Sequence, residues 1–113
     1  MSEVVEVLEK ARARIEDPER WTQRVAGRDE SGRAVPIDKA TQVCLDGALC
    51  LQFPDEDFRT LGGVPPYKAA VALLEQATDY KNIADFNDTH THPEVLAAFD
   101  RAIELARKDH PHA

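Results

Sequence analysis

The residues with the most chemical potential gather in one short stretch near the end of the chain. Asp88, His90 and His92 are two residues apart, and such side chains point to one side of an extended segment. A carboxylate and two imidazoles are suitable zinc ligands, and three protein ligands with an open fourth position are typical of a catalytic zinc site. The competing interpretation is a capping loop that happens to carry two histidines, because His92 lies in the first turn of an expected helix. His110 and His112 repeat the spacing beyond a helix about 25 Å long, so only an antiparallel dimer would bring the two pairs together.

A second group of polar or amphipathic residues flanks the ends of the expected helices. Its members are Trp21, Gln23, Asp46, Asn87 and Asp88. Small-molecule pockets combine apolar walls with a few converging polar groups, so convergence of these five around a cavity would indicate a ligand site. The alternative is that each is satisfied locally, by backbone carbonyls, turn and capping contacts, or an arginine in the case of Asp46.

Two cysteines, Cys44 and Cys50, lie in an apolar stretch with Asp46 between them. A reactive thiol needs electropositive, partly exposed surroundings, so we expect both to be buried rather than nucleophilic. Six residues along one helix separate their side chains by about 240°, which prevents a disulfide there. Unpaired cysteines favour a reducing compartment, the cytoplasm. The sequence indicates no catalytic residue and no cofactor, and it leaves open whether the protein is an enzyme.

The elements that must position these residues are mainly helical. Four segments have the apolar period of amphipathic helices: 3–16, 38–52, 66–78 and 92–108. The last begins with Thr91-His92-Pro93-Glu94, a capping box with proline in the first turn. The turn signature at 29–32 predicts that the 21–28 segment returns antiparallel through 33–35.

The sequence therefore predicts a single, mainly α domain over 1–113, with four helices and a small β-hairpin between helices 1 and 2. Residues 54–65 and 79–86 are expected to be irregular connections, the first either a lid or merely loose. The tail from about 109 should be frayed.

Composition restricts the partners. The chain has 14 basic and 21 acidic residues, a formal net charge of −7, which disfavours nucleic acids and anionic membranes. The longest uncharged apolar run, 69–74, is far too short to span a bilayer. Few aromatic residues, an acidic surface and the missing catalytic constellation favour a non-enzymatic interaction or regulatory module, acting as a homo-oligomer or with a protein partner. The alternative is a small-molecule- or metal-binding protein or enzyme, centred on the polar residues above.

Several scattered residues together resemble the signature of one family. They are Trp21-Thr22-Gln23, Arg28-Asp29 with Gly32, Cys44 with Gly47-Ala48-Leu49, and Asn87-Asp88 with Thr91, Glu94 and Val95. In order and spacing they resemble an uncharacterised family of short bacterial proteins, a domain of unknown function, over roughly residues 1–106. The resemblance implies a small, mostly helical fold and brings no activity, cofactor or catalytic residue. One position departs from the pattern: the family tends to carry glycine directly after Trp-x-Gln, where this chain has Arg24.

Overall fold

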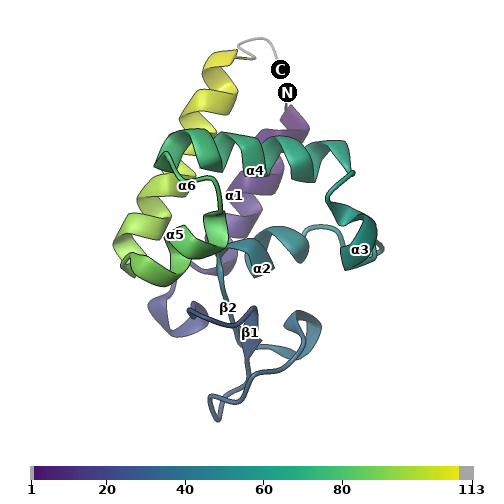
Figure 1. Cartoon of the computed structure of the whole chain (residues 1–113), viewed down its shortest axis with the longest axis vertical. Coiled ribbons are helices and arrows are strands. Elements are labelled where there is room, and N and C mark those ends of the chain that lie inside the picture. The colour runs from purple at the N-terminus through teal and green to yellow at the C-terminus, as the bar shows by residue number, and fades with distance from the viewer. Residues whose placement is uncertain (1, 110–113) are drawn as a thin grey trace.

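Helices dominate the computed structural model, which describes residues 2–109 (Figure 1). In chain order the elements are α1 (Ser2–Arg14), the 3₁₀ turn η1 (Pro18–Arg20), β1 (Gly27–Arg28), the 3₁₀ turn η2 (Ile37–Lys39), β2 (Gln42–Val43), α2 (Leu45–Cys50), α3 (Phe58–Leu61), α4 (Pro65–Thr78), α5 (Ile83–Thr89) and α6 (His92–Asp109). The mainly α fold with a small antiparallel β-pair between the first two helices is confirmed. The expected frayed tail lies, from residue 110 on, outside the described residues.

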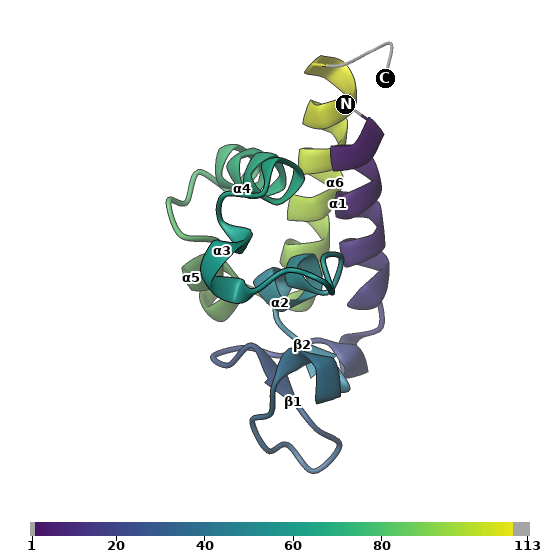
Figure 2. The ribbon, with the colours of Figure 1, turned by 90° about the vertical axis from the view of Figure 1, so that its right-hand side faces the viewer.

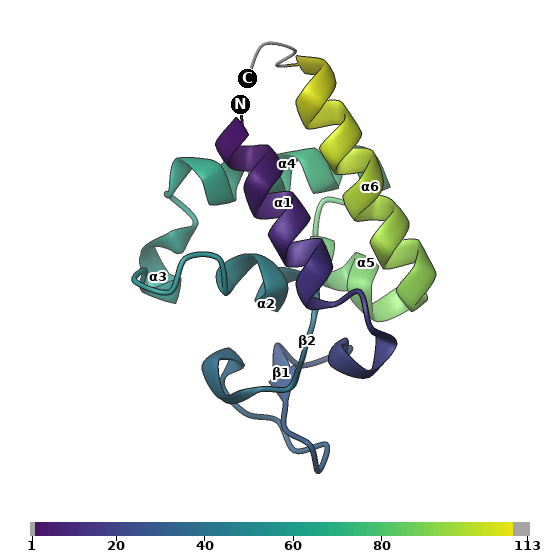
Figure 3. The same ribbon diagram turned by 180° about the vertical axis from the view of Figure 1, so that it is seen from behind.

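The helical body is built on α1 and α6, which lie side by side and run in opposite directions (Figures 1 and 3). α4 crosses both, and α2 and α5 close the end that faces the sheet (Figure 1). The largest fully buried side chains are Phe99, Leu8, Ile15, Leu45, Leu49, Leu74, Val43, Val95 and Asn87. Each large apolar side chain in such a core contributes about 1.5–3 kcal/mol. Asn87 is the one polar member of this set, so its amide must find partners inside the protein.

Three of the four expected helices have nearly the expected bounds. α1, α4 and α6 differ from the 3–16, 66–78 and 92–108 segments by at most two residues at either end. The capping box at the start of α6 is confirmed: Thr91 N donates to Glu94 Oε1 at 2.9 Å, and Glu94 N donates to Thr91 Oγ1 at 3.4 Å. The local sequence therefore determines where the longest helix begins.

The prediction of a helix over residues 38–52 is wrong for the first half of that range. Residues 38–44 contribute to η2 and β2 instead, and α2 begins only at Leu45. Cys44 is the N-cap, where its Sγ accepts a hydrogen bond from Gly47 N at 3.3 Å. Val43 is fully buried, but it lies in an extended segment whose backbone pairs with β1. Short apolar runs satisfy helix and strand periods equally well, which explains the error.

The β-pair uses a different second strand from the expected one. β1 pairs with β2, with Gly27 opposite Val43, whereas the 33–35 segment contributes a single bridge between Arg28 and Ala34. α2 packs closely against this layer. A Cβ on Gly47 would lie 2.8 Å from the backbone oxygen of Ala26, so glycine is required at this approach.

Two short helices, α3 and α5, lie in segments that were expected to be irregular. Asn82 is the N-cap of α5, and its Oδ1 accepts from Ala84 N and Asp85 N at 2.9 and 3.3 Å. Only Ile83 and Phe86 supply apolar anchors, too few to show a helical period. As a result, residues 87 and 88 belong to the last turn of a helix rather than to a capping loop.

Candidate functional site

A closed polar network joins the segment that precedes β1 to α5. We call the antiparallel pair of β1 and β2 the β-layer. We call the four side chains of the network, Trp21, Gln23, Asn87 and Asp88, the polar clamp. Asn87 is fully buried at its centre. Its Oδ1 accepts from Trp21 Nε1 at 2.7 Å and from Leu45 N at 3.1 Å, and its Nδ2 donates to Thr22 O at 3.1 Å. One amide therefore ties together three segments: residues 21–22, the start of α2, and α5.

Gln23 and Asp88 complete the clamp. Gln23 Nε2 donates to Asn87 O at 2.9 Å and to His90 O at 2.8 Å, which satisfies carbonyls at the end of α5 that have no helical partner. Asp88 Oδ1 accepts from Arg24 N at 2.7 Å. Arg24 has φ of 74°, a left-handed conformation that L-residues with a Cβ rarely adopt. It stands at the position where the sequence pattern suggested glycine.

The two histidines near the clamp hold backbone carbonyls. His92 Nε2 donates to Ile15 O at 2.6 Å, and its ring lies 5.4 Å from the Trp21 ring between centroids. His90 Nδ1 donates to Phe86 O at 2.9 Å, and its ring stacks on Phe86 with centroids 4.0 Å apart. Since a carbonyl only accepts, each of these nitrogens carries the proton and cannot bind a metal there.

The structure does not gather Asp88, His90 and His92 into a metal site. Asp88 holds the backbone of Arg24, while the two imidazoles turn to different neighbours. Within residues 2–109, no group of three or more His, Cys, Asp or Glu side chains is arranged to hold a metal ion. The second histidine pair, at 110 and 112, lies outside the described residues.

Asp46 stands apart from the clamp. Its Oδ1 accepts from the Tyr67 hydroxyl at 2.6 Å and lies 3.9 Å from Cys50 Sγ. Its partner is therefore a tyrosine rather than an arginine. Burial, followed by the hydrogen bond to Asp46, raises the pKa of Tyr67. Four of the five residues expected around a pocket do meet, but they bind one another and the backbone.

The thiols are buried and free, as expected. Burial, with a further contribution from the charge of Asp46, raises the pKa of Cys50 to about 12. Burial also raises the pKa of Cys44. Both thiols are therefore protonated at neutral pH, which makes them poor nucleophiles.

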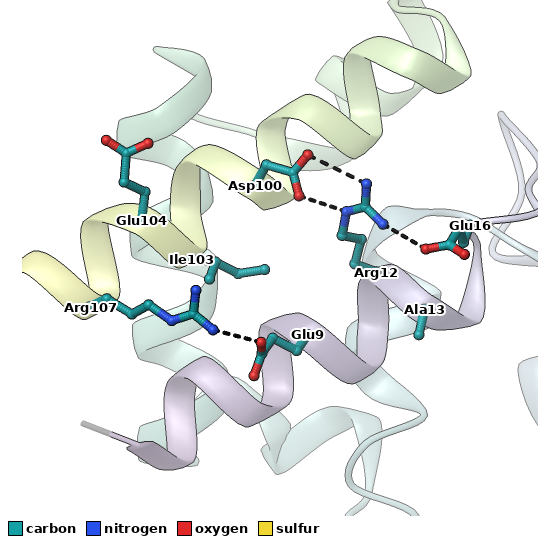
Figure 4. A pocket seen from close by; sticks show the side chains of 8 residues that line it. All are labelled: Glu9, Arg12, Ala13, Glu16, Asp100, Ile103, Glu104 and Arg107. Atoms are coloured by element: carbon teal, nitrogen blue, oxygen red, sulfur yellow. Dashed lines mark hydrogen bonds and ion pairs between the residues drawn. The ribbon is translucent and has the colours of Figure 1, made fainter.

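A surface groove of about 600 Å³ runs between α1 and α6 (Figure 4). Ion pairs bridge it: Arg12 Nε lies 2.7 Å from Asp100 Oδ1, and Arg107 Nη2 lies 2.8 Å from Glu9 Oε2. Arg12 also pairs with Glu16 at 2.8 Å on its own helix. These charges satisfy one another across the groove, so they join α1 to α6 rather than await a ligand. Exposed pairs of this kind contribute little to stability.

No helix in the part of the chain that the structure describes has both the length and the apolar character needed to cross a membrane.

A family model described as a family of unknown function (DUF6197) matches residues 1–105, a range that includes the polar clamp and the capping box of α6. Neither the curated proteins nor the solved structures gave a match.

Proposed function

This chain belongs to the DUF6197 family, as its sequence pattern suggested, and we propose that it is a non-enzymatic interaction module whose partner is a protein segment. The closed polar clamp is the observation that carries the proposal. Its side chains form hydrogen bonds of 2.7 to 3.1 Å with one another and with the backbone. A ligand site needs polar groups that converge on an open space, whereas these groups converge on each other. The clamp thus maintains the shape of the domain.

The charge distribution supports a basic partner. Residues 17–43, which include the β-layer, contain five basic and five acidic residues, so the entire net charge of −7 lies on the rest of the chain. A surface of one sign attracts partners of the opposite sign and repels those of the same sign. The proposed partner therefore contributes a basic, amphipathic segment.

The compartment we propose is the cytoplasm. Its support is that both cysteines are unpaired, which fits a reducing environment. Self-association, the other interaction expected from the sequence, is measured by sedimentation velocity of the protein alone at several concentrations.

A peptide-binding experiment tests the proposed function. The probe is a fluorescent peptide of about 18 residues, five helical turns, with leucine on one face and lysine on the other. Its control carries glutamate in place of every lysine. Fluorescence anisotropy should show saturable binding of the lysine peptide only, weakening as salt rises, because exposed charges are screened over about 10 Å at 0.1 M salt. The proposal fails if neither peptide binds or if both bind equally well.

A further inference from the structure

Figure 2 shows how α1, α2, α3 and α4 are arranged. Two shallow grooves that these elements border share Phe53 as a lining residue. One, of about 280 Å³, lies between η2, the end of α2 and α3. The other, of about 200 Å³, lies between the first turns of α1 and the start of α4. Because Phe53 is a wall of both, the two grooves lie next to each other on either side of its side chain, and we call the pair the Phe53 trough.

The floor of the first groove is apolar and is only partly covered by the fold. Leu51 and Phe53 are half-buried at its surface, above the buried Ile37 and Leu61. The Phe53 ring packs edge-on against Tyr67, with centroids 6.1 Å apart and an angle of 87° between the planes. The floor is therefore preformed, so a partner would not have to order it on binding.

The rim of the trough is acidic. Asp38 and Glu56 border the first groove, and Glu3 and Glu6 border the second; all four are exposed. The basic residue on this rim, Lys10, is paired with Glu6 at 2.7 Å. Asp55 precedes Glu56 in sequence and adds to the negative charge, whereas Asp57 is paired with Arg59 at 3.0 Å. An apolar floor between rows of carboxylates is complementary to a segment with apolar side chains on one face and cationic ones beside them.

The volumes favour side chains over a small molecule. Each groove is smaller than the roughly 300–1,000 Å³ of typical small-molecule pockets. Peptide-binding grooves instead receive separate apolar anchors, and a few such anchors supply most of the affinity. We infer that the Phe53 trough docks a basic amphipathic segment of a partner protein, with apolar anchors on both sides of Phe53. This inference rests on the proposed function and names the surface that performs it.

Charge reversals on the rim test the location. Asp38→Lys and Glu56→Lys change exposed side chains and leave the apolar floor intact. Each should weaken binding of the leucine–lysine peptide about threefold or more at low salt. Glu30→Lys is the matched control: it changes the net charge equally at an exposed turn that does not line the trough, and should alter the affinity less than about twofold.

An apolar truncation tests the anchor. Phe53→Ala should weaken peptide binding about tenfold or more, because truncated central aromatic anchors carry large losses. In spectra of ¹⁵N-labelled protein, the peptide should shift amide signals of residues 51–56 more than those of 29–32. If Phe53→Ala fails to fold, the two rim reversals decide the question, since both residues are exposed.

Three results would overturn the inference. If the rim reversals behave like Glu30→Lys while the peptide still binds, the trough is excluded and the proposed function stands. If the peptide fails to bind the unaltered protein, both fail together. If the protein alone forms a dimer that Glu56→Lys dissociates and that excludes the peptide, the trough belongs to a second copy of this chain.

Discussion

Asn87 stands out at the scale of single residues because its whole amide is used in the core. Removing that amide would leave the half-buried Trp21 Nε1–H and the fully buried Leu45 N–H without acceptors. Each orphaned buried group costs about 1–3 kcal/mol. The loss of the Asn87 amide should therefore lower the free energy of unfolding more than the loss of any surface contact in the domain.

Asn87→Ala is expected to lower the free energy of unfolding by about 3 kcal/mol or more. Asn82→Ala, in the same helix, removes only an exposed N-cap and should cost about 1 kcal/mol. Urea denaturation of the two variants makes the comparison. Equal losses would show that the clamp does not hold the fold as described.

Arg24 carries the backbone strain next to the clamp. Arg24→Gly should raise the free energy of unfolding by about 0.5–1 kcal/mol, because glycine adopts positive φ without the Cβ clash. Arg24→Ala keeps the Cβ and removes the guanidinium, so it should bring no such gain. A stabilised alanine variant would instead mean that the guanidinium itself is unfavourable.

Cys50 should be chemically silent in the folded protein. With its pKa raised to about 12, only a minute fraction is thiolate at pH 8, so alkylation by iodoacetamide should be on the order of a thousandfold slower than in the unfolded chain. Cys44→Ser leaves Cys50 as the single thiol and keeps a side chain that can cap α2. Mass spectrometry with and without urea measures both rates. Similar rates would contradict the burial of this thiol.

Local signals govern the elements to different degrees. α6 could be predicted to within a residue or two, because its cap, proline and apolar stripe all lie within the segment itself. α5 could not, since seven residues with two anchors carry no readable period. The 38–44 stretch looked helical because burial at Val43 and Cys44 comes from pairing with β1 and from capping, which are contacts with other parts of the chain.

The capping box of α6 should give the protein part of its acid sensitivity. Hydrogen bonds from the backbone N–H and then the hydroxyl of Thr91 lower the pKa of Glu94 below its ordinary 4.5. When the pKa of a carboxyl group is lower in the folded protein than in the unfolded chain, its ionisation stabilises the fold. This stabilisation is fully present at pH values above the unfolded pKa, and it is lost as the pH falls through the folded pKa.

Glu94→Gln tests this effect, because glutamine preserves the capping box but not the charge. The stability difference between the original protein and this variant should be present at pH 7 and shrink as pH falls below 4.5. Urea denaturation at several pH values measures it. A difference that stays constant down to pH 3 would show that the charge of Glu94 plays no part.

At the scale of the whole molecule, the polar clamp, whose residues looked functional in the sequence, is separate from the Phe53 trough, the surface that we propose binds the partner. The clamp connects residues that are 64 to 66 positions apart in sequence, so no local pattern could show what Trp21, Gln23 and Asn87 converge on. Residue types did indicate that these side chains belong together. The Phe53 trough escaped prediction because it depends on how α1, α2, α3 and α4 pack, and none of its residues is unusual in type.

The most direct test of this separation measures stability and peptide affinity in the same two variants. Gln23→Ala should lose about 1–2 kcal/mol of unfolding free energy, because two hydrogen bonds disappear, yet bind the leucine–lysine peptide as the unaltered protein does. Glu56→Lys should keep its stability and lose about threefold or more in affinity at low salt. If folded Gln23→Ala instead loses affinity as strongly as Glu56→Lys, the clamp is itself part of the binding site, which contradicts the separation of clamp and trough.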